Sequence, residues 1–170
     1  ISIPSDYIVH DPILITSDSD FESQGWTGTG TVEKPYVLEN LTITQQIQYE
    51  PCIEIMDTTV YYVIQNCYLD APLDGNAVYI QEAENGRLEN CDIIGSIGYI
   101  SALYCVDSFY LVMSNCTVIG GAGFNDCDWS EVLDCTIYCT LQLFSSPNTL
   151  VDNCELFSTY HEAADISGDN

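Results

Sequence analysis

The sequence predicts an all-β fold: a right-handed parallel β-helix (β-solenoid) of about six coils, preceded by an N-terminal capping segment. Three observations lead to this prediction. A six-residue pattern recurs along the chain, and short stretches between its copies alternate inward and outward residues. In addition, no segment keeps the apolar period of about 3.6 residues that a helical connector would show. Short strands stacked coil upon coil account for all three.

The recurring pattern reads aliphatic, any residue, Asn, Cys, any residue, aliphatic. Its copies, some of them imperfect, are residues 38–43, 64–69, 88–93, 113–118, 132–137 and 151–156. The third position advances by 26, 24, 25, 19 and 19 residues from copy to copy. A constant motif with variable spacing is typical of coils whose turns differ in length.

A second, weaker series lies between the copies, at residues 52–55, 77–80, 102–105 and 140–143. Its period of two residues is that of a strand, so each coil supplies at least two short strands. Stacking the coils about 4.8 Å apart makes parallel sheets around one continuous core. We place the repeats at residues 36–170 and the capping segment at residues 1–35.

The Asn of the motif predicts a structural ladder. Asn tolerates the left-handed backbone of a tight turn between two strands, and stacked amides can bond from coil to coil. The predicted ladder consists of Asn40, Asn66, Asn90, Asn115, Asp134 and Asn153, with Asp134 as the interruption.

The chain has nine cysteines, and five of them share the position after the motif Asn. This row is Cys67, Cys91, Cys116, Cys135 and Cys154. Leu41 holds the position in the first copy, which indicates an inward apolar slot that Cys fills as a small hydrophobe. Buried free thiols and disulfides between coils both stay open for the row. Better candidates for disulfides or intersubunit bonds lie off the row, at Cys52, Cys105, Cys127 and Cys139.

The charge of the chain excludes several partners. Lys34 and Arg87 are its two basic residues, against 26 acidic ones, for a formal net charge of -24. Such a chain repels nucleic acids, anionic lipid surfaces and polyanionic sugars. Its apolar runs are too short to span a bilayer, so no membrane insertion is expected.

The repeats resemble those of the pectate-lyase-like superfamily, in the branch common among archaeal surface proteins. The opening segment is similar too, through residues 10–15, Phe21, residues 25–30 and residues 35–38. The resemblance covers nearly the whole chain and implies an extracellular or cell-envelope location. It does not select a function, because enzymes, adhesins and scaffolds share this solenoid. The acidic, cysteine-rich composition also resembles that of archaeal S-layer and sheath proteins.

No catalytic residue is expected. Sugar hydrolysis needs carboxylates at matched positions on one face, whereas the paired acids here recur at no common coil position. Those pairs are Asp18 with Asp20, Asp70 with Asp74, Glu82 with Glu84, and Asp126 with Asp128. Neither basic residue sits among such acids, as a lyase would need. The two histidines, His10 and His161, fall at opposite ends of the solenoid.

No dedicated metal site or cofactor is expected either. Residues 18–22 begin like a calcium loop, but Ser23 replaces the required Gly and Thr29 stands where the bidentate Glu belongs. Acidic turns stacked along the solenoid would bind calcium only weakly.

An exposed aromatic row is predicted at Tyr79 and Tyr104, in line with Glu54 and Gln142 on one sheet. Tyrosine rings in such a row stack on sugars or pack against another subunit. Ordinary stacking between coils is the alternative interpretation.

The ends of the solenoid suggest how it is used. Residues 160–166 look like the start of another strand without a capping helix, which leaves a strand edge that invites pairing with another chain. We therefore expect a homo-oligomer or polymer formed through the solenoid ends: a non-catalytic, self-assembling subunit of an extracellular surface layer, sheath or filament. The alternative is a carbohydrate-binding or carbohydrate-cleaving β-helix.

Overall fold

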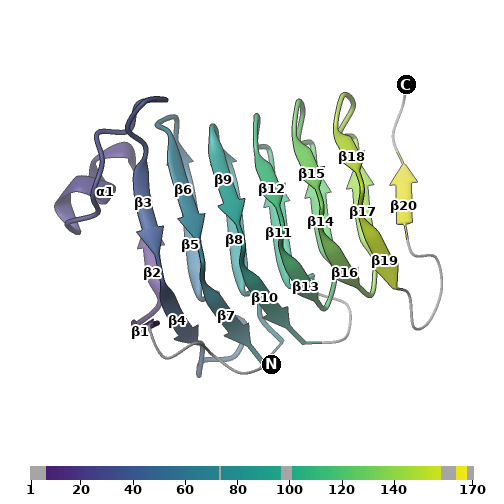
Figure 1. Ribbon diagram of the computed structural model, residues 1–170, viewed down its shortest axis with the longest axis horizontal. Coiled ribbons are helices and arrows are strands. Elements are labelled where there is room, and N and C mark those ends of the chain that lie inside the picture. The colour runs from purple at the N-terminus through teal and green to yellow at the C-terminus, as the bar shows by residue number, and fades with distance from the viewer. Residues whose placement is uncertain (1–6, 73, 97–100, 158–163, 168–170) are drawn as a thin grey trace.

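The protein is a parallel β-helix built from three sheets (Figure 1). The computed structural model describes residues 7–72, 74–96, 101–157 and 164–167. Strands of one sheet lie three elements apart along the chain, so each coil contributes one strand to each sheet. The pattern gives six successive coils, as the sequence predicted.

Each sheet is a ladder of parallel strands. Sheet A contains β1 (Ile8–Val9), β4 (Leu41–Thr44), β7 (Tyr68–Ala71), β10 (Asp92–Gly95), β13 (Thr117–Ile119), β16 (Thr136–Tyr138) and β19 (Glu155–Phe157). Sheet B contains β2 (Ile13–Ile15), β5 (Ile53–Thr58), β8 (Val78–Ala83), β11 (Leu103–Val106), β14 (Ala122–Asn125), β17 (Leu141–Phe144) and β20 (Ala164–Ser167). Sheet C contains β3 (Tyr36–Glu39), β6 (Tyr62–Gln65), β9 (Gly86–Glu89), β12 (Val112–Ser114), β15 (Glu131–Leu133) and β18 (Leu150–Asp152).

The recurring motif spans two strands and the turn between them. In the third copy, Leu88 and Glu89 end β9, Asn90 and Cys91 form the turn, and residues 92–93 begin β10. The weaker series supplies sheet B, so a coil has three strands where the sequence required at least two. Strand β14 escaped that series because Gly123 provides no outward side chain to mark the alternation.

The core is a stack of inward rows that continue from coil to coil. On sheet A, one row aligns Ile43 with Leu69, Ile93, Val118 and Ile137, all fully buried or nearly so. The same residue class recurs in register because a parallel strand pair places equivalent side chains directly above one another. Burying one such side chain contributes about 1.5–3 kcal/mol, and the stack multiplies that gain by the number of coils.

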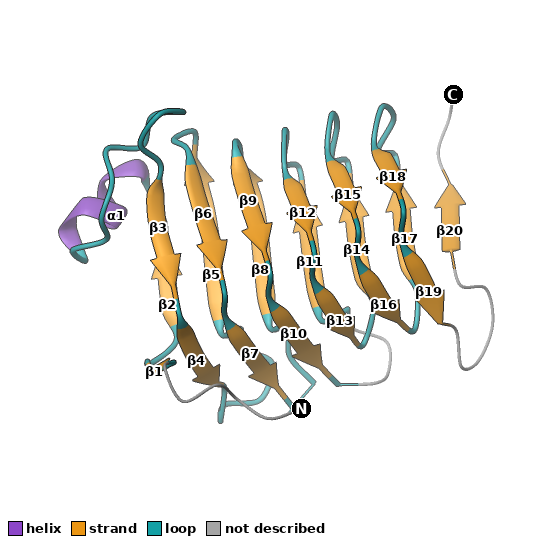
Figure 2. Cartoon of the chain, viewed as in Figure 1, coloured by secondary structure: helices purple, strands orange, loops and turns teal. Residues whose placement is uncertain are grey.

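The capping segment contains a short helix and also contributes strands β1 and β2 to sheets A and B (Figure 2). Helix α1 (Asp18–Ser23) buries Phe21 against Tyr36 and Tyr62, with ring centroids 5.0 and 5.5 Å apart. Strand β2 lies within residues 1–35 yet pairs with β5, so the solenoid begins before the boundary placed at residue 36. The cap and the first coil are therefore one packed unit.

Asp18 bonds the cap to the C-terminal end of β5 in the first coil. Its carboxylate accepts hydrogen bonds from the Thr58 hydroxyl (2.6 Å), the Thr59 backbone N–H (2.8 Å) and the Thr59 hydroxyl (3.3 Å). Burial acts to raise the Asp18 pKa, but these hydrogen bonds to the ionised form outweigh it and lower the pKa below 3.8. The residue that looked like the start of a calcium loop thus serves as an anchor.

We expect Asp18→Ala to destabilise the fold by about 1–3 kcal/mol at neutral pH, because the fully buried Thr58 hydroxyl loses its acceptor. The lowered pKa makes the carboxylate's contribution complete above pH 3.8 and lost as the pH falls through the folded-state value. Denaturant unfolding of the variant and the wild type should therefore converge in strong acid. Asp11→Ala, at an exposed position of the same segment, serves as the control. A constant difference down to the lowest pH would contradict this role.

Candidate functional site

The turn between sheets C and A has the same backbone in every coil. Its third motif position has a left-handed φ in all six copies: Asn40 (57°), Asn66 (52°), Asn90 (55°), Asn115 (51°), Asp134 (53°) and Asn153 (51°). Asn and Asp visit this region at lower cost than most other residues that carry a Cβ. The repeated residue type therefore follows from the repeated backbone.

Backbone groups join these turns from coil to coil. The N–H of Asn40 donates to the Gln65 carbonyl at 3.1 Å, and that of Asn66 donates to the Glu89 carbonyl at 3.0 Å. Equivalent bonds leave Asn90, Asn115 and Asp134. A side-chain bond runs from Asn153 to Asp134, and the other four Asn side chains have no hydrogen-bond partner among the described residues. The side-chain ladder expected from the sequence is thus present only between Asn153 and Asp134 among the described residues. The other Asn amides are half-exposed or exposed, so they can bond to water instead of to each other.

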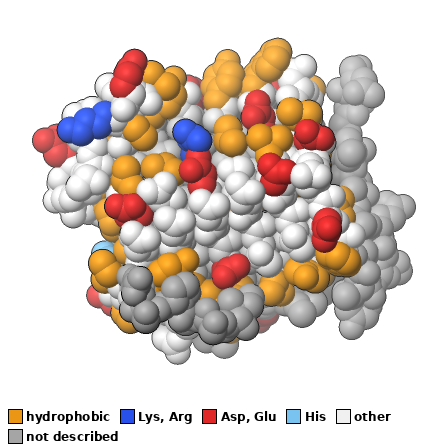
Figure 3. Space-filling model, in the orientation of Figure 1, with side chains coloured by type: hydrophobic (Ala, Val, Ile, Leu, Met, Phe, Trp, Pro, Cys, Tyr) orange, Lys and Arg blue, Asp and Glu red, His pale blue; other side chains and the backbone are white. Residues whose placement is uncertain are grey.

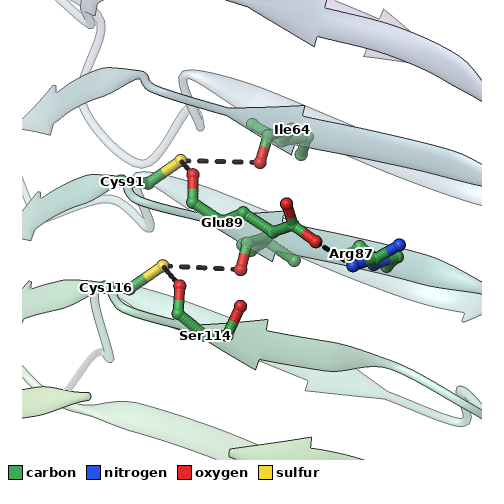
Figure 4. A network of polar contacts seen from close by, with 7 residues as sticks. Ile64, Arg87, Glu89, Cys91, Ser114 and Cys116 are labelled. Carbon is green, nitrogen blue, oxygen red and sulfur yellow. Dashed lines mark hydrogen bonds and ion pairs between the residues drawn. The ribbon is translucent and has the colours of Figure 1, made fainter. Parts of the chain in front are cut away.

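The cysteine row lies just inside the same turns (Figure 4). Each thiol reaches two backbone carbonyls, one two residues earlier and one on the preceding coil. The Sγ of Cys91, for example, lies 3.3 Å from the Glu89 carbonyl oxygen and 3.6 Å from that of Ile64, so its single S–H has two acceptors within reach. Cys67, Cys116, Cys135 and Cys154 repeat both contacts. The slot therefore fits a small apolar side chain, and it also offers a carbonyl oxygen that can accept a hydrogen bond from a thiol. The Leu41 side chain, which has no donor, cannot make that bond.

All nine cysteines lie in the described part of the chain, and all nine are free. Of the four that we considered for disulfides or intersubunit bonds, Cys52, Cys105 and Cys127 are buried in the core, where a thiol of another subunit has no access. Burial raises the pKa of Cys52 to about 12 and that of Cys127 to about 11. Cys139 is partly exposed, so it is the member of the four with access to solvent.

The outward row of sheet B contains the predicted tyrosines. Parallel pairing aligns Glu54 with Tyr79, Tyr79 with Tyr104, and Tyr104 with Gly123. The two tyrosine rings stack with centroids 6.1 Å apart, and the Tyr104 ring lies over Gly123, where a Cβ would come within 2.9 Å of it. Sequence reasoning passed over Gly123, although its place between two alternating strand residues was the available signal. The tyrosines stack from coil to coil, and both remain half-exposed.

Charged groups lie on both strands and turns. The expectation that the acidic pairs recur at no common coil position is wrong, because in-register pairing puts Asp57, Glu82, Asp107 and Asp126 at one position of successive coils, each with a φ of 48–52°. Arg87 pairs with Glu89 on the surface of sheet C (Figure 4). His10 packs on Trp26 at the capped end, and His161 lies outside the described residues. Within the described ranges, no three His, Cys, Asp or Glu side chains come together as a group that could hold a metal ion. The weak calcium binding considered from the sequence stays a prediction.

The two edges of sheet A expose apolar side chains. Strand β1 forms one edge, with Ile8 and Val9 exposed. Strand β19 forms the other, where Phe157 is exposed and stacks on Tyr138 with a centroid distance of 5.1 Å. Sequence reasoning missed the first edge, because a two-residue strand inside a capping segment carries no period. The apolar pair Ile8–Val9 was the available signal.

The end nearer the C-terminus extends this exposed surface to the other sheets. Leu150 and Val151 of β18 are exposed at the edge of sheet C. Strand β20 pairs with β17 and ends sheet B, which agrees with the strand expected at residues 160–166, of which 160–163 lie outside the described residues. All three sheets thus present a strand at this edge of the described solenoid (Figure 1).

Comparison of the chain with protein-family models, curated proteins and solved structures gives no match. The helix in the described residues is far too short to cross a membrane.

We expect Asn90→Ala to lower the free energy of unfolding by about 1 kcal/mol, because Ala adopts the left-handed backbone conformation less readily than Asn or Gly. Asn90→Gly should stay close to wild type, since the Asn90 side chain makes no hydrogen bond in the described chain. Chemical denaturation of the two variants checks this. Equal losses in both would show that the amide itself holds the turn.

We expect thiol alkylation of the native protein at neutral pH to modify Cys139 and Cys154 first, because these two are partly exposed. Buried Cys52 and Cys127 stay protonated, since their raised pKa values lie several units above the working pH. Peptide mass mapping after a short pulse of iodoacetamide gives the order, and a urea-unfolded sample gives the reference rate. Labelling of Cys52 as fast as Cys139 would contradict the buried assignment.

Proposed function

We propose that this protein is a non-catalytic structural subunit of the cell exterior, which assembles head to tail through its solenoid ends into a surface layer, sheath or filament. The observation that supports this most is the pair of exposed apolar edges on sheet A. Ile8 and Val9 mark one edge, and Phe157 marks the other. The two edges belong to opposite ends of one stack, so one copy can offer β19 where the next offers β1.

Pairing of these edges would repeat the contact that already joins the coils. Within the chain, β1 lies parallel to β4 and β19 lies parallel to β16. A further parallel strand on β19 would satisfy its free backbone groups and cover Phe157. Such a contact is heterologous, because the surfaces of the two partners differ, and it therefore propagates into an open polymer instead of closing as a dimer.

The charge of the chain sets the conditions for assembly. Copies with a formal net charge of -24 repel one another at low ionic strength. Salt screens this repulsion over about 8–10 Å, so assembly is favoured in saline or cation-rich media of the kind found outside a cell. The resemblance to the branch of the pectate-lyase-like superfamily that is common among archaeal surface proteins supports the same extracellular or cell-envelope location.

A carbohydrate-binding or carbohydrate-cleaving β-helix is the second candidate. The stacked, half-exposed pair Tyr79 and Tyr104 favours it, since rings on an outward sheet face can support a sugar. The neighbouring Glu54 supplies a carboxylate one coil away, and burial raises its pKa. We place this candidate second because, within the described ranges, no three His, Cys, Asp or Glu side chains come together as a group. The carboxylates that do recur in register, Asp57, Glu82, Asp107 and Asp126, lie one to a coil.

We expect Ile8→Asp and Phe157→Asp each to weaken assembly at least about tenfold, since a carboxylate replaces an apolar side chain that the next copy would bury. Ile47→Asp is the matched control: Ile47 is 64% exposed and Ile8 62%, but Ile47 lies in the turn between sheets A and B. Sedimentation velocity and negative-stain electron microscopy across a salt series measure the polymer. Equal loss in all three variants, or a monomeric wild type at every salt concentration, would overturn the proposal.

A further inference from the structure

The turns between sheets B and C carry large aromatic side chains on two neighbouring coils. Phe109 and Tyr110 lie on one turn and Trp129 on the next, and all three are exposed. The turns are stacked in register, because Phe109 bridges to Asp128 and the Tyr110 N–H donates to the Asp128 carbonyl at 3.2 Å. Hydrophobic side chains gather along the edge of the molecule where these turns lie (Figure 3). We call Phe109, Tyr110 and Trp129 the aromatic ridge.

The backbone under the ridge is unfavourable for its residues. Tyr110 and Trp129 have φ angles of 56° and 57°, a left-handed conformation that is an outlier for bulky side chains. In-register pairing shows which residues share this position in successive coils: Asn85, Tyr110, Trp129 and Asn148. The flanking coils thus use Asn, which suits the conformation, at φ 60° and 61°. At Tyr110 and Trp129 the left-handed backbone is less favourable than it would be with Asn. Such strained positions cluster at binding sites.

The rings of the ridge are free to receive a ligand. Tyr110 is 52% exposed and Trp129 56%, and neither stacks on another ring among the described residues. Within the same part of the chain, the Tyr110 hydroxyl and the Trp129 indole N–H have no hydrogen-bond partner. Each therefore offers an open face and an unused polar group.

Acidic residues lie on the same stacked turns. Glu84 and Asp128 are the two backbone bridge partners of Phe109, one coil to either side, and the Oδ1 of Asp128 is buried without a hydrogen-bond partner among the described residues. The surface thus combines aromatic faces, hydrogen-bond donors and a carboxylate acceptor. A ligand with hydroxyl groups can use all of these at once, because a hydroxyl both donates and accepts. A Lys or Arg side chain has no acceptor for the indole N–H, and an anionic sugar would be repelled by the net charge of -24.

We propose that the aromatic ridge binds a neutral polysaccharide, whose sugar rings stack on Tyr110 and Trp129 and whose hydroxyl groups bond to Glu84. Tyr110 and Trp129 lie on neighbouring coils, whose backbones are about 4.8 Å apart along the solenoid axis, so the glycan chain runs along the stacked turns. This site lies on different residues from Tyr79 and Tyr104, and it requires no contact between subunits. A subunit with this ridge would attach to a surface glycan independently of its assembly.

The test exploits the residue that the fold itself uses at this position. Trp129→Asn and Tyr110→Asn place the side chain of the flanking coils on the same backbone, so both variants should fold at least as stably as the wild type. The matched control is Tyr49→Asn: Tyr49 is 66% exposed with φ 65°, but lies in a turn between sheets A and B. The ligands are soluble or insoluble glucan, mannan and chitin, with polygalacturonate and poly-lysine as charged comparisons. Binding is measured by retention and by tryptophan fluorescence in 0.5 M salt.

We expect the wild type and Tyr49→Asn to bind at least one neutral polysaccharide, and each ridge variant to lose about tenfold in affinity. Ile8→Asp should bind as well as the wild type, which separates this site from assembly. Absence of binding to every neutral glycan tested would overturn the proposal. So would equal binding by Trp129→Asn, or retention only on poly-lysine at low salt, which would assign the ridge to a cationic partner.

Discussion

Every coil of this protein depends on the backbone hydrogen bonds that it makes to the next one. At the turn between sheets C and A, the N–H of each of the first five motif residues donates to a carbonyl of the following coil at 3.0–3.1 Å, and the φ of these residues is 51–57°. That geometry sets the register of the strands on both sides, because a shift of one residue would turn their apolar side chains outward. The continuous core therefore follows from one turn conformation that is repeated from coil to coil.

The cysteines follow from the same turn. The slot behind each motif Asn is small and lies beside a carbonyl that already accepts the N–H of the preceding coil, as at Glu89 with Asn66 and Cys91. A thiol fills the volume of a small hydrophobe and also donates a weak hydrogen bond to that oxygen. The contacts with Cys116 and Cys67, together with burial, raise the pKa of Cys91. Much of the cysteine content is thus accounted for by packing, without any disulfide.

Outward positions are freed from these constraints, and the chain varies there. Tyr104 on one coil lies beside Gly123 on the next, and Phe157 is exposed on the strand that ends sheet A. Two turns between sheets B and C carry Tyr110 and Trp129 where the neighbouring coils have Asn. The repeated inward rows explain why the molecule is a solenoid, whereas the differences between coils carry the proposals about what it contacts. The formal net charge of -24 disfavours contact with anionic surfaces at low ionic strength.

The sequence by itself determined the solenoid, its coil number and the Asn and Cys rows, because inward residues repeat with the motif and a stacked fold needs that repetition. It did not determine how the chain caps itself: Asp18 meets Thr58 and Thr59 across 40 residues. The tertiary structure likewise decided that Gly123 lies in a strand of sheet B and that Cys52, Cys105 and Cys127 are free. It also decided that the motif turns are joined by backbone hydrogen bonds and, for the most part, not by side-chain amides. The aromatic ridge was decided there too, since only in-register stacking brings Tyr110 beside Trp129. Local patterns encode which side of a strand faces the core, but contacts between distant turns exist only once the coils are stacked.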